Sequence, residues 1–296
     1  MAETVWLIID MEPPRKIPQY LYDEFTMCNR IRVEYIYQDN SSQESYTRIY
    51  KRETIDSYIR DIKQKKTFYY GSTDSCLYKA LERHSIYGKK VAIIGSQCPL
   101  YESICLFHGG SPTTIEYQKI ISEDNRLTVM TVEEYSKKPV LFDAAFSISS
   151  FEHDGLGRYG DPIVPDGDFQ AMAKMKSVIK KGGLLFLSVP IGRDMLVWNL
   201  HRVYGKLRLP KLMHGWKIVN IYHDWSGFDL SSKGNYGGCS PVFVLKNSDL
   251  GEYNFNYFLG TMAVAGFIRQ FFRKIKGWIK INFSILVVFI KRSLKK

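Results

Sequence analysis

One polar segment combines many of the side chains that could do chemistry. It runs from Ser150 to Asp168, SFEHDGLGRYGDPIVPDGD, and contains five carboxylates, one histidine, one arginine and four glycines. Because an imidazole takes up a proton near neutral pH, His153 is a candidate general base; the alternative is a structural histidine bonded to loop backbone. Connections between alternating strands and helices are usually about 2 to 6 residues long, so a loop of about 20 residues indicates a functional site.

The acidic residues of this segment form two groups. Glu152 and Asp154 flank His153 and could orient its ring or bind hydroxyl groups of a substrate. The other three stand beside glycine or proline, which favours turns and helix caps, although their oxygen atoms could also hold a divalent cation: Asp161, Asp166 and Asp168. Their spacing matches no standard cation-binding loop, and no other residues cluster at metal-ligand spacing, so we expect no metal.

Three basic residues are candidates for substrate binding. Arg158 follows a glycine in the same segment, where it could clamp a carboxylate or phosphate or pair with a nearby aspartate. His201 and Arg202 follow the fifth predicted strand and form a second pair of candidates.

A strand, a tight turn, a helix and a second strand are predicted from Lys89 to Glu116. The apolar run Val91 to Ile94 predicts a buried strand, and Gly95 allows the chain to turn without a side chain in the way. Pro99 can begin a helix, in which Leu100, Ile104 and Phe107 share one face. An acid about 20 residues after the turn glycine is typical of nucleoside sites, where it accepts ribose hydroxyls. A purely structural strand–turn–helix remains the alternative.

Strands and helices alternate from residue 89 to residue 190. Further buried strands are predicted at Leu127 to Val132, Leu141 to Ser149 and Leu184 to Val189, and a helix at Phe169 to Ile179. This order predicts an α/β fold with a doubly wound, Rossmann-like, mostly parallel sheet. Ligands bind such sheets at the carboxyl ends of the strands, which is where the polar loops fall.

Elements outside this alternation complete the predicted organisation. Trp216 to Tyr222 and Val242 to Leu245 are expected to be antiparallel neighbours, and Asp74 is a plausible helix N-cap. We predict an N-terminal extension (1–73), a Rossmann-like domain (74–250) and a basic amphipathic C-terminal helical tail (251–296).

Composition and charge narrow the class of protein. With 45% hydrophobic and 24% charged residues the chain is typical of a globular protein, and its apolar run at residues 5–9 is too short to span a membrane. Nine of the eleven net positive charges follow Glu252, which leaves +2 for the other 252 residues. This tail predicts either contact with an anionic membrane surface or packing on the domain with a solvated basic face. No nucleic-acid motif appears.

The five cysteines are odd in number and show no C-x-x-C spacing, which favours a reducing compartment. We therefore expect a cytoplasmic protein, peripheral to a membrane if the tail contacts lipid.

The region from about residue 74 to residue 250 resembles the class I S-adenosylmethionine-dependent methyltransferases. The family's order "FD…EH…LKPGG…P" matches FDAAFSISSFEHDG, IKKGG and a later proline, at these positions: Phe142, Asp143, Glu152, His153, Lys181, Gly182, Gly183 and Pro190. More narrowly, SSFEHDGLGRYGDP with the later HRVYG resembles a domain-of-unknown-function family first described from nematode (Caenorhabditis) sequences.

The resemblance implies a cofactor site for S-adenosylmethionine. It places the glycine-rich turn at Gly95, Ser96 and Gln97, the ribose-binding acid at Glu116, the adenine contacts at Thr131 and Val132, and the residues near the reactive methyl at Ser149 and Ser150. The family usually has D-x-G-x-G-x-G, whereas this chain has Ile93, Gln97 and Pro99 at the first acid and the later glycines, and Thr131 where an acid is common.

Three functions follow from these observations. The first is methyl transfer to a small-molecule or glycan-like acceptor, with His153 and Glu152 as the catalytic pair. The second is a non-catalytic Rossmann-like binding module that associates with a membrane through its tail. A nicotinamide-dependent oxidoreductase is disfavoured, because the turn lacks the pattern G-x-G-x-x-G.

Overall fold

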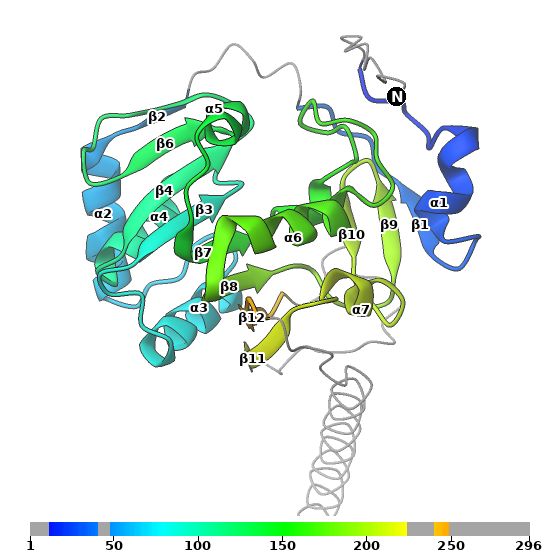
Figure 1. Ribbon diagram of the computed structural model, residues 1–296. Helices are drawn as coiled ribbons and strands as arrows, with labels where there is room; N and C mark the ends of the chain where they lie inside the picture. Colours follow the sequence, from blue (N-terminus) through cyan, green and yellow to red (C-terminus); the bar gives the residue numbers. More distant parts are fainter. Residues whose placement is uncertain (1–11, 41–47, 224–239, 249–296) are drawn as a thin grey trace, which may run out of the picture. The chain divides into compact units, whose positions relative to one another are not determined.

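A seven-stranded sheet is the centre of the fold. The computed structural model describes residues 12–40, 48–223 and 240–248, all within the compact unit Met1–Tyr253. The sheet has the order β11-β12-β8-β7-β3-β4-β6 (Figure 1), and its strands are β3 (Lys90–Ile94), β4 (Ser111–Glu116), β6 (Thr128–Thr131), β7 (Phe142–Ile148), β8 (Ile179–Ser188), β11 (Lys217–Tyr222) and β12 (Val242–Lys246).

Six of these strands run in the same direction, and β12 alone runs in the opposite direction. β3 pairs in parallel with both β4 and β7, while β12 pairs antiparallel with β8 and with β11. From β3 the chain winds outward to β4 and β6 and then returns to the other side for β7 and β8. The sheet is therefore doubly wound with its switch point between β3 and β7, and the predicted fold class is confirmed.

Both faces of the sheet are covered, which explains the near-continuous apolar runs in its central strands. On one face Val91, Ile93, Ala144 and Phe146 pack with residues of α3 (Ser72–Arg83) and α4 (Leu100–Phe107). The intervening residues, such as Ala145, point to the other face and are equally buried. That second face is covered by α6 (Gly167–Val178), which contacts β8 and the short helix α7 (Arg208–Leu212).

Shorter elements surround this sheet. β1 (Arg32–Tyr35) pairs with β9 (Met195–Trp198), which also pairs with β10 (His201–Val203), and β2 (Arg48–Tyr50) pairs with β5 (Ile120–Ser122). The helical elements are η1 (Gln19–Leu21), α1 (Tyr22–Thr26), α2 (Arg52–Lys63), α5 (Val132–Lys137) and η3 (Phe151–His153).

Several local predictions are confirmed and others are wrong. β11 and β12 are antiparallel neighbours, as expected. Asp74 is not an N-cap: it lies inside the first turn of α3, where its carboxylate accepts a hydrogen bond from the backbone N–H of Phe68 at 2.6 Å. Phe107 is 41% exposed, because α4 ends there and turns its last residue away from the sheet. β8 begins at Ile179, so the Lys-Gly-Gly sequence lies in a strand and does not end the helix.

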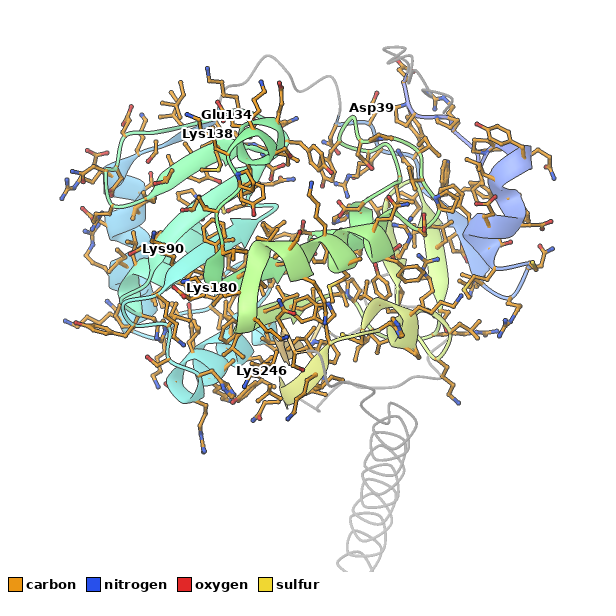
Figure 2. The ribbon with its side chains drawn as sticks, viewed as in Figure 1. Asp39, Lys90, Glu134, Lys138, Lys180 and Lys246 are labelled. Atoms are coloured by element: carbon orange, nitrogen blue, oxygen red, sulfur yellow. The ribbon has the colours of Figure 1, made fainter. Side chains whose placement is uncertain are left out.

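The two edges of the parallel sheet differ in their chemistry. Lys90 and Lys180 mark the edge where the parallel strands begin, and Glu134 on α5 marks the edge where they end (Figure 2). At the first edge Asp143 accepts hydrogen bonds from Lys180 Nζ (2.7 Å) and from the backbone N–H of Lys90 (2.9 Å). Asp143 therefore joins strand beginnings and lies away from the edge where ligands bind such sheets.

We expect Phe146→Ala to lower the free energy of unfolding by about 3 to 5 kcal/mol, because the Phe146 side chain is fully buried and packs edge to face on Phe186 with ring centroids 5.3 Å apart. Phe107→Ala is the matched control and should cost far less, since Phe107 is partly exposed. Urea titrations followed by circular dichroism measure both values. Equal losses for the two variants would contradict this placement of the core.

Candidate functional site

A cleft of about 1370 Å³ opens at the carboxyl ends of the parallel strands. Eleven of the residues proposed from the sequence for cofactor binding, substrate binding or catalysis line it: Gly95, Gln97, Glu116, Val132, Ser149, Ser150, Glu152, His153, Asp154, Arg158 and His201. The remaining three, Ser96, Thr131 and Arg202, do not. The parallel register accounts for this convergence, because Ile94 is opposite Ile115 on β4 and opposite Ser147 on β7. Segments that follow these strands must therefore leave the sheet side by side.

Gly95 forms the turn at the bottom of the cleft. Its φ of +71° is a left-handed conformation that suits glycine. A Cβ atom built on Gly95 would lie 2.1 Å from Ser150 Oγ, so a side chain at this position would collide with the segment after β7. The turn can thus approach a neighbouring group closely, as a nucleoside site requires.

A buried polar cluster supports the turn from below. Glu102 on α4 is fully buried; Thr114 Oγ1 is 2.6 Å from one of its carboxyl oxygens and Ser96 Oγ is 3.0 Å from the other. Ser96 Oγ also lies 2.9 Å from the carbonyl oxygen of Cys98, and the Tyr50 hydroxyl donates to the Ser96 carbonyl at 2.9 Å. Ser96 therefore holds the shape of the turn.

The protonation of Glu102 follows from this cluster. The Ser96 hydroxyl has a single proton but faces two acceptors, so both contacts are satisfied only when Glu102 carries a proton that it donates to Ser96. Burial acts in the same direction and raises the pKa of Glu102 to about 7. Sequence reasoning missed this residue, although it is the only charged residue of the helix LYESICLF.

Glu116 ends β4 and faces the cleft. One of its carboxylate oxygens accepts a hydrogen bond from the backbone N–H of Tyr117 at 2.8 Å. Burial raises the pKa of Glu116, while hydrogen bonds from the backbone and the charge of Arg48 act against that rise. A carboxylate has about four lone-pair positions, so Glu116 can still accept hydroxyl groups of a ligand.

Ser149 and Glu152 form a short hydrogen-bonded link at the end of β7. Ser149 adopts a positive φ of +54°, which is uncommon for a residue with a side chain, and its hydroxyl lies 2.5 Å from Glu152 Oε1. Glu152 Oε2 is buried and has no hydrogen-bond partner among the described residues. Burial raises the pKa of Glu152 to about 7, against the opposing effect of the Ser149 hydrogen bond. Glu152 can therefore exchange a proton near neutral pH.

His153 is held in one tautomer. Its Nδ1 lies 2.6 Å from the carbonyl oxygen of Leu200, and a carbonyl can only accept, so Nδ1 carries the proton and Nε2 has a free lone pair. Burial, reinforced by the charge of Arg158, lowers the pKa of His153 to about 3. Nε2 lies 3.9 Å from Glu152 Oε1, but with this low pKa the contact joins a neutral imidazole to a carboxyl group and is no ion pair.

Tyrosines and basic groups complete the lining of the cleft. Arg158 stacks over the Tyr159 ring at 4.9 Å and donates from Nε to Asn40 Oδ1 at 2.9 Å, so it pairs with no aspartate in the described residues. Tyr159 and Gln97 both line the cleft and lie close enough for Gln97 to influence the pKa of the Tyr159 hydroxyl, so the long loop lies near the glycine turn. The His201 ring lies edge-on to His153, with centroids 6.3 Å apart.

Arg202 supports the backbone of the long loop and does not line the cleft. It is 1% exposed, and its guanidinium donates to the carbonyl oxygens of Asp154 (2.5 Å) and Pro165 (3.2 Å). Asp168 is also fully buried; it binds the Arg208 guanidinium at 2.6 and 2.8 Å and the Tyr204 hydroxyl at 2.9 Å. Asp168 therefore anchors the loop to the segment after β8 and is not simply a helix cap.

Thr131 and Asp161 make hydrogen bonds to nearby backbone groups. Thr131 is the N-cap of α5: its hydroxyl accepts from the backbone N–H of Glu134 at 3.1 Å, and the Glu134 carboxylate accepts from the backbone N–H of Thr131 at 2.7 Å. Asp161 accepts from the backbone N–H groups of Gly155 (2.7 Å) and Leu156 (3.0 Å), which confirms a turn-forming role. Within the described ranges no group of three or more metal-binding side chains could hold an ion.

The fold and the cleft together define a doubly wound Rossmann-like protein with a cleft at its switch point. Residues 88–235 match the family described as "Caenorhabditis protein of unknown function, DUF268", and because this match covers half of the 296 residues, the chain belongs to that family. No curated protein matches the sequence. Among the described residues, no helix is both long and apolar enough to cross a membrane.

Solved structures with a similar course of the chain include three bacterial or archaeal proteins. A 1,6-didemethyltoxoflavin-N1-methyltransferase from Burkholderia thailandensis, with bound 1,6-didemethyltoxoflavin and S-adenosylhomocysteine, is 15% identical, with 67% of this chain and 86% of that chain covered and a TM-score of 0.46. A SAM-dependent methyltransferase from Archaeoglobus fulgidus is 12% identical (58% and 93% covered, TM-score 0.39), and a putative hemolysin from Lactococcus lactis is 15% identical (58% and 86%, 0.37). The fold assignment rests on the strand order itself.

We expect Glu102→Gln to make the stability of the fold less sensitive to pH. The folded-state pKa of about 7 lies above the ordinary value of 4.5, so the folded state binds this proton more tightly and loses stability as pH rises through that interval. The ionisation of Glu102 alone should cost roughly 2 kcal/mol between about pH 5.5 and pH 8.

Urea unfolding at these two pH values measures the effect. The decrease in unfolding free energy should be smaller in Glu102→Gln than in the wild type by that amount. Glu24→Gln on the exposed side of α1 is the control and should behave as the wild type. An unchanged decrease in the Glu102 variant would show that Glu102 is already ionised at the lower pH.

Proposed function

We propose that this protein is an S-adenosylmethionine-dependent methyltransferase that acts on a small-molecule or glycan-like acceptor. The observation that carries the proposal is that the Glu116 carboxylate, the Gly95 turn and the Glu152–His153 pair all line one cleft at the switch point of a doubly wound sheet. The order of the FD, EH and KKGG motifs in the sequence favours this cofactor over other nucleosides.

The residues of the cleft fit an adenosyl group. Glu116 has free lone pairs for ribose hydroxyls, and the Gly95 turn lies beside it in the lining of the same cleft. Gln97, Val132 and Ser149 also line the cleft and are proposed as cofactor contacts, with Ser96 and Thr131 supporting them through the turn and the cap of α5. When bound, S-adenosylmethionine supplies an electrophilic methyl group on a sulfonium centre.

The protein aligns the two reactants, excludes water from the cleft and provides a side chain that takes up the proton of the acceptor. Nε2 of neutral His153 can accept a hydrogen bond from an acceptor hydroxyl and then its proton, while the Glu152 carboxylate 3.9 Å away balances the resulting charge. Arg158 and His201 line the same cleft and are proposed to orient the acceptor. Arg202 is proposed to act through the loop that it holds, because it does not line the cleft.

One observation favours a second candidate, a non-catalytic Rossmann-like binding module. Ile93 replaces the acid that the resemblance leads one to expect before the turn, and it is buried in the core behind α4. Gln97 replaces a glycine, and its side chain lies near the Tyr159 hydroxyl. The tail to which membrane association is assigned, residues 251–296, lies outside the described residues, so its membrane contact and the cytoplasmic, peripheral location stay predictions, as does the division into three domains.

Calorimetric titration with S-adenosylmethionine and with NAD separates these functions. We expect the full chain to bind S-adenosylmethionine and not NAD, and we expect Glu116→Ala to weaken that binding at least tenfold, because the ribose hydroxyls lose their acceptor. Glu123→Ala, at an exposed position outside the cleft, is the control. Binding of neither ligand by the wild type would support the module instead, and binding of NAD alone would support the oxidoreductase.

We expect His153→Ala to reduce turnover by about 10²- to 10⁴-fold while leaving cofactor affinity unchanged. In the wild type kcat/KM should rise with pH through about 7, because Glu152 must ionise to stabilise a protonated His153. Glu152→Gln should remove this rise.

Release of S-adenosylhomocysteine during turnover measures the rate, and the calorimetric titration provides the binding control. Unchanged turnover in His153→Ala would refute the role of this residue as a base. A rate in Glu152→Gln that still rises through pH 7 would assign the ionisation to another group.

A further inference from the structure

One carboxyl group in the cleft has no partner among the residues that the structure describes. Asp154 follows the Glu152–His153 pair and lines the cleft, yet among the described residues its side chain makes no hydrogen bond and no ion pair. Its backbone, in contrast, is fixed: the carbonyl oxygen accepts from Arg202 and the N–H donates to the carbonyl oxygen of Phe151 at 3.2 Å. A carboxyl group that is held in place but left without a partner is available to a ligand.

Asp154 is linked through Tyr117 to the part of the cleft that contains Glu116, where we propose that the cofactor binds. Tyr117 directly follows Glu116, lines the cleft and is 57% exposed in its mouth. The pKa of Tyr117 is raised to about 12, chiefly by burial and next by the charge of Asp154, so the two side chains lie within electrostatic reach of each other. A ring adjacent to the ribose-binding acid is suited to stack on a nucleobase, and a carboxyl group within electrostatic reach of that ring can pair with the edge of the base.

We infer that Asp154 recognises the base of the adenosyl group by pairing with its exocyclic amino edge. This inference rests on the proposed function. The adenine edge offers an N–H donor beside a ring-nitrogen acceptor, which is the pattern that asparagine and glutamine amides read with two hydrogen bonds. A protonated carboxyl group presents the same pair, one acceptor oxygen and one O–H donor.

Two further observations agree with this role. Burial, followed by the charge of Asp161, raises the pKa of Asp154 well above its ordinary value, which favours the protonated form that can donate as well as accept. Thr131 cannot easily provide the contact, because its hydroxyl and its backbone N–H are both engaged in the capping box of α5. The contact with the adenine edge would thus come from the long loop that follows β7 and not from the end of β6.

Calorimetry with two ligands tests the inference: S-adenosylhomocysteine and its 6-deamino analogue, which lacks only the amino group of the base. The wild type should bind the analogue about tenfold more weakly. Asp154→Ala should bind S-adenosylhomocysteine about tenfold more weakly than the wild type does and should no longer distinguish the two ligands. Asp154→Asn should retain affinity and preference, since its amide offers the same donor and acceptor.

Asp166→Ala is the matched control, because Asp166 is exposed, belongs to the same loop and does not line the cleft. Circular dichroism and urea unfolding establish that each variant is folded, and Asp154→Asn keeps the test valid if the alanine variant is not. Failure of the wild type to bind S-adenosylhomocysteine would overturn the proposed function and this inference together. Binding by the wild type, with the same preference for the amino group in Asp154→Ala, would overturn the inference alone.

Discussion

The close approach of Gly95 to Ser150 is the constraint on which the site depends. β3 and β7 are neighbouring parallel strands, so the segments that follow them must leave the sheet at the same point. They can do so only because one of them has no side chain there: a Cβ atom on Gly95 would overlap Ser150. This proximity places the turn, the Glu152–His153 pair and the end of β4 around a common cleft.

Burial determines the electrostatics of this cleft. Glu102 and Glu152 both have pKa values raised to about 7, and the pKa of His153 is lowered to about 3, so in each case the low dielectric surroundings favour the neutral form. The structure compensates each group with hydroxyl or carbonyl partners and not with opposite charges. Glu102 and Glu152 can therefore change protonation at a small free-energy cost near neutral pH, whereas His153 stays neutral there.

The long loop owes its shape to residues far away in sequence. Backbone N–H groups of the loop converge on Asp161, and the buried pair of Asp168 and Arg208 ties its end to α7. Arg202 donates to the backbone carbonyl groups of Asp154 and Pro165 in the loop. A loop of this length would lose much conformational entropy on ordering, and these charge-assisted hydrogen bonds offset that loss. The side chains of the loop that line the cleft can therefore be held in one geometry.

Local patterns in the sequence were sufficient to predict the parallel sheet and its reactive edge. Continuous apolar runs such as Val91 to Ile94 indicate strands buried on both faces, and the carboxyl ends of parallel strands necessarily share an edge. The place of Gly95 and Glu116 in the lining of the cleft was predictable for the same reason, since both stand at strand ends.

Contacts between distant segments were decided only by the tertiary structure. Glu102 appears in the sequence as one charge on a short helix, and its partners Ser96 and Thr114 become neighbours only when β3, α4 and β4 pack together. Arg202 resembles a substrate-binding residue until β10 pairs with β9 and turns its side chain into the protein. The physical reason is that strand periodicity is a local property of the chain, whereas burial, the pKa values that it shifts and the partners of a buried charge depend on which segments meet.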